Sequence, residues 1–160
     1  MKKTIRDIDW SDKTAVVRCD FNVPLVNGKI SDDTRIVAAL PTINYLRDHG
    51  AKVVILSHLG RPKGEPNDDF SLHPVAERLS ERLGAHVNFI KSDLVVDDKV
   101  SEAVKNLDPS EVALLENVRY RSEETKNDPT FARELASLGD VFVQEAFGTA
   151  HRAHASTTGI

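Results

Sequence analysis

Near its start the chain reads Thr14-Ala15-Val16-Val17-Arg18-Cys19, a short run rich in β-branched residues. Further runs of this kind lie at Lys52 to Leu56, Val87 to Ile90, Val112 to Leu115 and Val141 to Val143. Continuous apolar stretches of this length are typical of strands buried on both faces of a sheet. The runs therefore predict five strands.

Helical patterns fill the intervals between these runs. We expect helices from about Asp33 to His49, from Ser71 to Leu83, from Asp98 to Leu107, and from Asp128-Pro129 to Leu138-Gly139. Ser71 is the expected cap of the second helix and an Asp the cap of the third, while Gly50 and Gly84 end the first two. Pro41 lies inside the first pattern and predicts a kink or a break there.

Strands that alternate with helices predict an α/β fold. We expect a three-layer, doubly wound parallel sheet (Rossmann-like) of at least five strands, with helices on both faces. A length of 160 residues fits one such domain, so residues 1–160 are expected to form a single unit. Two loops are long, Asp20 to Asp32 and Leu59 to Phe70, and long loops in a compact domain are often functional.

The composition excludes several classes of partner. The 21 Lys and Arg residues against 25 Asp and Glu residues give a net charge of −4, which argues against binding to nucleic acid or to an anionic membrane. Cys19 is the single cysteine, so the chain has no internal disulfide. No greasy run follows the N-terminal Met1, and no stretch approaches the length of a membrane span. We expect a cytoplasmic protein.

Arg and His residues follow four of the five expected strands. They are Arg35 beyond the first loop, His58 and Arg61 after the second strand, Arg119 and Arg121 after the fourth, and His151, Arg152 and His154 after the fifth. In an open α/β sheet, ligands bind beyond the carboxyl ends of the strands. The planar guanidinium group binds phosphate or carboxylate through two parallel hydrogen bonds. The pattern therefore predicts a site for a small polyanion.

Other chemistries have weaker support in the sequence. The chain contains no G-x-G-x-x-G, no G-x-x-x-x-G-K-[ST] and no G-x-S-x-G motif. His151 and His154 have the spacing of one helix face, but no third zinc ligand is evident. Asp20-Phe21-Asn22 resembles the D-x-D pair of aspartyl-phosphate phosphatases, yet Asn22 cannot donate a proton as a general acid. In extended backbone Asp20 and Asn22 face the same side, where they suit a ligand that carries a hydroxyl group.

Five segments of the chain resemble the motifs of phosphoglycerate kinases, in the family's order. They are Val16-Val17-Arg18-Cys19-Asp20-Phe21-Asn22-Val23-Pro24, Asp33-Thr34-Arg35, Ser57-His58-Leu59-Gly60-Arg61-Pro62, Leu115-Glu116-Asn117-Val118-Arg119 and Ala146-Phe147-Gly148-Thr149-Ala150-His151-Arg152-Ala153-His154. Gln144-Glu145 departs from the Asn-Asp that the family often shows. The resemblance covers the whole chain but less than half of the family's usual length.

This resemblance implies a substrate site. Asp20 and Asn22, with Phe21 between them, would hold the substrate hydroxyl group. Arg35 would lie near the substrate carboxyl group and act as the catalytic residue. The distal phosphate would be bound by the remaining set: His58, Arg61, Arg119 and Arg152, with the backbone of Leu59 and Gly60.

The resemblance also implies the reaction, a reversible phosphoryl transfer in glycolysis between 1,3-bisphosphoglycerate and ADP that yields 3-phosphoglycerate and ATP. The Mg-ATP or Mg-ADP would be bound by a C-terminal nucleotide domain that this chain lacks. We therefore expect a monomeric triose-binding domain with no metal or cofactor of its own and no turnover alone. The alternative is a naturally short phosphate- or carboxylate-binding α/β module without transfer chemistry. The length of the encoding reading frame would distinguish these two hypotheses.

Overall fold

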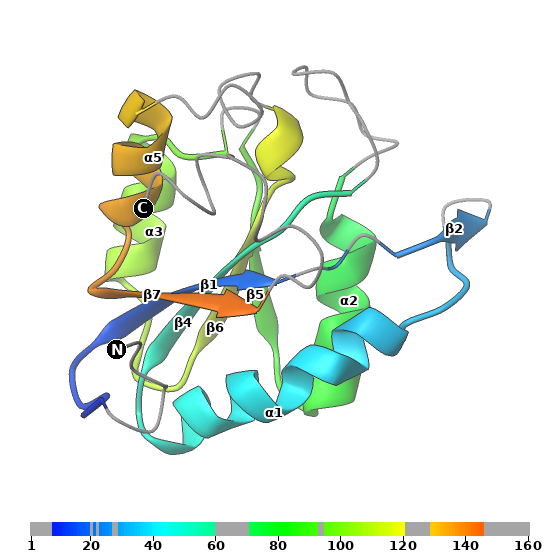
Figure 1. Ribbon diagram of the computed structural model, residues 1–160, viewed down its shortest axis with the longest axis horizontal. Helices are drawn as coiled ribbons and strands as arrows, with labels where there is room; N and C mark the ends of the chain where they lie inside the picture. The colour runs from blue at the N-terminus through cyan, green and yellow to red at the C-terminus, as the bar shows by residue number, and fades with distance from the viewer. Residues whose placement is uncertain are drawn as a thin grey trace.

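A computed structural model of the chain describes residues 8–19, 21, 23–26, 29–59, 71–92, 95–120 and 129–145 (Figure 1). Of residues 129–132 and 144–145 it describes the backbone alone. In these ranges no helix has both the length and the apolar character that crossing a lipid bilayer would require.

The centre of the molecule is a parallel sheet of five strands. The strands are β1 (Thr14–Cys19), β4 (Lys52–Leu56), β5 (Val87–Ile90), β6 (Val112–Leu115) and β7 (Val141–Glu145). Their order across the sheet is β5-β6-β4-β1-β7, and every neighbouring pair is parallel. Four of the strands have the bounds that the apolar runs predict, and β7 continues two residues further.

Helices cover both faces of this sheet, as Figure 1 shows. They are α1 (Thr34–Asp48), α2 (His73–Leu83), α3 (Asp98–Lys105) and α5 (Pro129–Ala136). Alternate strand residues point to opposite faces, so Val17 packs in the core that includes α1 and α2, and Val16 in the core that includes α3 and α5. The predicted three-layer, doubly wound arrangement is confirmed, and Cys19 lies buried in the first core.

The helix ends follow local chemistry. The side chain of Asp97 caps α3 by accepting a hydrogen bond from the Val100 N–H at 2.9 Å, which confirms the predicted Asp cap. Gly84 ends α2 in the left-handed region, with φ at 68°, where glycine is favoured. Helices α3 and α5 end at Lys105 and Ala136, short of the predicted Leu107 and Leu138, and a turn begins at the next residue of each.

Two expectations for the helices differ from the structure. The break expected at Pro41 is absent, because helix α1 runs through Pro41 as one element. Because Pro41 and Val37 lie on its exposed face, water can reach the Val37 carbonyl group, whose usual N–H donor the proline lacks. The cap position of α2 is Leu72 and not Ser71, because the carboxylate of Glu116 reaches the start of this helix from the end of β6.

The expected loop from Asp20 to Asp32 contains a small antiparallel hairpin. Its strands are β2 (Leu25–Val26) and β3 (Lys29–Ile30), with Leu25 opposite Ile30. Strands of two residues are too short to show a periodic pattern. The Asn27-Gly28 dipeptide is a known hairpin signal, and it could have indicated the pairing of β2 with β3 from the sequence.

Candidate functional site

The described candidate residues lie beyond the carboxyl ends of β1, β4 and β6 or at the start of α1. Phe21 follows β1, His58 and Leu59 follow β4, and Arg119 lies in the short 3-10 helix η3 (Val118–Tyr120) after β6. Arg35 lies in the first turn of α1. The other predicted site residues lie outside the described residues: Asp20, Asn22, Gly60, Arg61 and Arg152.

Ser57 connects the ends of three strands. Its hydroxyl oxygen accepts a hydrogen bond from the Phe21 N–H at 2.9 Å, and its carbonyl oxygen accepts one from the Val118 N–H at 3.0 Å. The backbones that follow β1 and β6 are therefore held to the residue that follows β4. The side chain of Phe21 is fully buried in the core that includes α1 and α2, so it supports this edge from inside the domain.

Asn117 connects Leu59 with Arg119. Its side-chain amide donates a hydrogen bond to the Leu59 carbonyl oxygen at 2.7 Å, and its amide oxygen accepts one from the Arg119 N–H at 3.0 Å. Asn117 is fully buried, so both contacts are shielded from water. Two of the predicted phosphate-binding positions are thereby held on opposite sides of one side chain.

Arg18 contacts His58 in the interior of the protein. The Arg18 Nη2 atom lies 3.1 Å from His58 Nδ1, and both side chains are buried. A guanidinium group can only donate hydrogen bonds, so Nδ1 is the acceptor, and the proton of the neutral ring is on Nε2. The two residues meet because Arg18 pairs with Leu56 across the sheet, and His58 follows Leu56 by two residues.

Glu116 holds the start of α2 against the end of β6. Its buried carboxylate accepts hydrogen bonds from the Ser71 hydroxyl group and from the Leu72 N–H, each at 2.9 Å. The Ser71 hydroxyl oxygen in turn accepts one from the His73 N–H at 3.2 Å. Glu116 and the next residue, Asn117, therefore bind the residues on either side of segment 60–70, since Asn117 binds Leu59. This segment carries Arg61.

Arg35 is exposed in the first turn of α1, ahead of which lie two acidic residues. The Asp32 carboxylate accepts hydrogen bonds from the hydroxyl group and the N–H of Thr34, at 2.6 and 2.9 Å, and these bonds lower the pKa of Asp32. The Asp33 carboxylate accepts hydrogen bonds from Arg82 and Arg78, which lower its pKa in that order of size. Both carboxylates are therefore ionised at neutral pH.

Reasoning from the sequence predicted His58 and Arg119 as site residues at this edge, but it assigned no role in the site to Arg18, Ser57, Glu116 or Asn117. We call the hydrogen-bonded set at the strand ends the junction: Arg18, Ser57, His58, Glu116, Asn117 and Arg119. Arg18 had a visible signal, since it is a charged residue inside an apolar run. Among the described residues, no group of three or more His, Cys, Asp or Glu side chains could hold a metal ion, and His151 and His154 lie outside them.

The chain was compared with known proteins. The family model described as phosphoglycerate kinase matches residues 5–160. The chain belongs to the phosphoglycerate kinase family. The resemblance that five motifs suggested is therefore confirmed.

Relatives and solved structures of this family align with almost the whole chain. It is 57% identical to a phosphoglycerate kinase of Clostridium botulinum (strain Hall) over 159 residues, and this match covers 99% of the chain and 40% of the relative. For the Coxiella burnetii structure, identity is 42%, the TM-score is 0.85, and coverage is 97% of this chain and 38% of that one. For the Pyrococcus horikoshii structure, identity is 38%, the TM-score is 0.86, and coverage is 97% of this chain and 39% of that one. The chain thus spans about two fifths of the length of the curated relatives.

Proposed function

We propose that residues 1–160 form the triose-binding domain of a phosphoglycerate kinase. The ligand is 3-phosphoglycerate, or 1,3-bisphosphoglycerate in the reverse direction, bound beyond the carboxyl ends of the strands. The observation that carries the proposal is the junction, in which Arg18 contacts His58 and Asn117 connects Arg119 with the neighbouring Leu59. In a member of this family, donors held so firmly at one edge suit a ligand that has an anionic group.

The phosphate group would be bound at the junction. His58 would donate from Nε2, because Arg18 occupies its other ring nitrogen. Arg119 would add its guanidinium group, together with Arg61, Arg152 and the backbone of Gly60. Asp20 and Asn22 would bind the substrate hydroxyl group, and Arg35 the carboxyl end.

The reaction would join two groups that different parts of the complete protein hold. A carboxylate oxygen of 3-phosphoglycerate attacks the γ-phosphorus of Mg-ATP, the bond to the bridging oxygen breaks, and Mg-ADP leaves. Arg35 would neutralise charge on the transferring phosphoryl group, since this reaction depends on positioning and electrostatic stabilisation. The nucleotide would be bound by a C-terminal domain, and closure of the two domains would exclude water from the acyl phosphate. We propose a monomer that works in the cytoplasm.

Titration calorimetry of the chain with 3-phosphoglycerate and with glycerate tests this assignment. A charge-assisted hydrogen bond contributes about 1.5–3 kcal/mol, so loss of the phosphate should reduce the affinity by at least about tenfold. Arg119→Ala should remove much of this difference, and Arg119→Lys should restore it in part, because lysine keeps the charge without the planar fork. Equal affinities for the two ligands would contradict the assignment of a phosphate site.

A further inference from the structure

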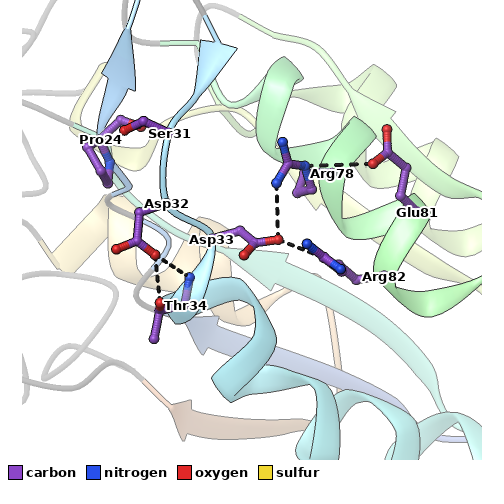
Figure 2. Close-up of polar contacts among 8 residues, drawn as sticks. All are labelled: Pro24, Ser31, Asp32, Asp33, Thr34, Arg78, Glu81 and Arg82. Carbon is purple, nitrogen blue, oxygen red and sulfur yellow. Dashed lines mark hydrogen bonds and ion pairs between the residues drawn. The ribbon is translucent and has the colours of Figure 1, made fainter.

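Asp33 receives two guanidinium groups from a different helix. Its Oδ2 atom lies 2.6 Å from Arg82 Nε and 3.1 Å from Arg78 Nη1, and its side chain is 17% exposed. Figure 2 shows the Asp33 carboxylate at the start of α1 directed toward Arg78 and Arg82, which both belong to α2. The start of α1 is therefore connected to α2 by two ion pairs that share one oxygen atom.

This use of Asp33 is unusual for its position. Asp33 is the N-cap residue of α1, where an Asp side chain ordinarily accepts hydrogen bonds from the first N–H groups of its own helix. Here the side chain makes no cap hydrogen bond, and Asp32 accepts the Thr34 N–H instead. The Asp33 carboxylate is thus free to bind α2.

Helix α2 is held to the junction as well. Glu116 binds Ser71 and the Leu72 N–H at the start of this helix, and the next residue, Asn117, binds the Arg119 N–H. A continuous set of hydrogen bonds and one rigid helix therefore connects Arg119 with Asp33. Arg35 follows Asp33 by two residues, in the first turn of α1.

We infer that Arg78 and Arg82 are positioning residues, which act through Asp33 to set the place of Arg35 relative to the junction. This inference rests on the proposed function. The phosphate and the carboxylate of 3-phosphoglycerate are separated by a short fixed chain of carbon atoms, so the groups that bind its two ends must keep a fixed separation. Displacements of about 1 Å in such sites cost up to about a hundredfold in rate.

The first turn of a helix is where such a connection has most effect. Its N–H groups have no partners within the helix, so this turn is the part of the helix that opens most readily. Arg35 projects from this turn and is exposed. The two ion pairs at Asp33, two residues before Arg35, restrict the backbone from which it projects.

The test compares two ligands that differ only at the carboxyl end. 3-Phosphoglycerate and glycerol 3-phosphate share the phosphate and the neighbouring hydroxyl group, so the ratio of their affinities reports the carboxylate end alone. In the 160-residue chain, Arg82→Ala should lower the affinity for 3-phosphoglycerate by on the order of tenfold and leave that for glycerol 3-phosphate unchanged. Arg82→Lys should restore part of the preference. Arg133→Ala, an exposed arginine of α5 on the other face of the sheet, is the matched control and should change neither affinity.

A double variant separates positioning from general stability. If Arg82 acts through Arg35, then Arg82→Ala should have no further effect on 3-phosphoglycerate affinity in an Arg35→Ala background. Asp33→Asn keeps the shape of the side chain and provides the same test if Arg82→Ala fails to fold. An equal loss for both ligands, or an unchanged preference in Arg82→Ala and Asp33→Asn, would overturn the positioning role. An absence of preference in the unmodified chain would instead overturn the proposed carboxylate site and this inference with it.

Discussion

The buried contact between Arg18 and His58 assigns a specific role to each nitrogen of the imidazole ring. Nδ1 accepts the hydrogen bond from the guanidinium group, so the proton of the neutral ring is on Nε2. Metal-free anion sites need donors whose protons are in place before the ligand arrives, because reorientation costs binding energy. At the scale of single residues, Arg18 therefore fixes the tautomer in which His58 would meet the proposed phosphate group.

The tautomer of His58 can be measured directly. A long-range ¹H–¹⁵N spectrum of the chain at mildly alkaline pH should show His58 with a protonated Nε2 and a bare Nδ1. His49 is an internal control, since its Nδ1 lies 2.7 Å from the Tyr45 carbonyl oxygen and must donate, which requires the opposite tautomer. Arg18→Met, which keeps volume but loses the donor, should give His58 a mixture of both forms. A protonated Nδ1 on His58 in the unmodified chain would contradict the role assigned to Arg18.

At the scale of elements, local pattern and long-range contact contribute differently. The runs at Thr14, Lys52, Val87 and Val112 predicted four strands with correct bounds, because a strand buried on both faces must be apolar along its whole length. The motifs also predicted Leu59, His58 and Arg119 as neighbours beyond the strand ends. The hydrogen bonds that hold this edge together were not predictable from the sequence. Arg18 and His58 are 40 residues apart in the chain, and Glu116 and Ser71 are 45 residues apart. Such contacts depend on strand register and order, which no local pattern encodes.

The cap of α3 provides a prediction with a definite pH dependence. Asp97 accepts hydrogen bonds from the Ser92 hydroxyl group at 2.7 Å and from the Val100 N–H at 2.9 Å, and these bonds lower its pKa below the ordinary 3.8. The stabilisation is fully present above the unfolded-state value and is lost as pH falls through the lowered pKa. Asp97→Ala should reduce the free energy of unfolding by about 1 kcal/mol at neutral pH, with a smaller difference in acid.

Urea denaturation at neutral and acidic pH measures both values. Asp97→Asn is the control, because asparagine also caps helices well but carries no charge. It should retain most of the stability at neutral pH, and its stability should change less with pH than that of the unmodified chain. A deficit in Asp97→Ala that grows as pH falls would show that the ionised carboxylate is not what stabilises α3.

At the scale of the whole molecule, the sheet has two roles that fall on different residues. The apolar side chains along the strands pack in the core and stabilise the fold, while polar residues at the carboxyl ends of the strands form the junction. Ser57 and Asn117 contribute to both, because Ser57 fixes the backbones that follow β1 and β6, while Asn117 places Leu59 and Arg119. Binding of an anion at this edge should therefore stabilise the whole domain.

Because binding should stabilise the domain, a thermal melt of the chain can measure binding of the substrate separately from catalysis. A ligand that binds only the folded state at about ten times its dissociation constant adds about 1.4 kcal/mol, which raises the Tm of a domain of this size by about 3–6 °C. Millimolar 3-phosphoglycerate should produce such a shift. Added salt should reduce it, because exposed charges are screened.

ATP is the contrasting ligand for the same melt. The chain spans 40% of the length of its relatives and contains no glycine-rich phosphate loop of the common nucleotide motifs, so ATP should shift the Tm little. A coupled kinase assay on the same sample should show no phosphoryl transfer, because in-line transfer needs Mg-nucleotide held opposite the substrate. Kinase activity from the chain alone would show that these residues hold both substrates. A melt raised by ATP but not by 3-phosphoglycerate would reverse the assignment, since the anion site beyond the strands would then serve the nucleotide.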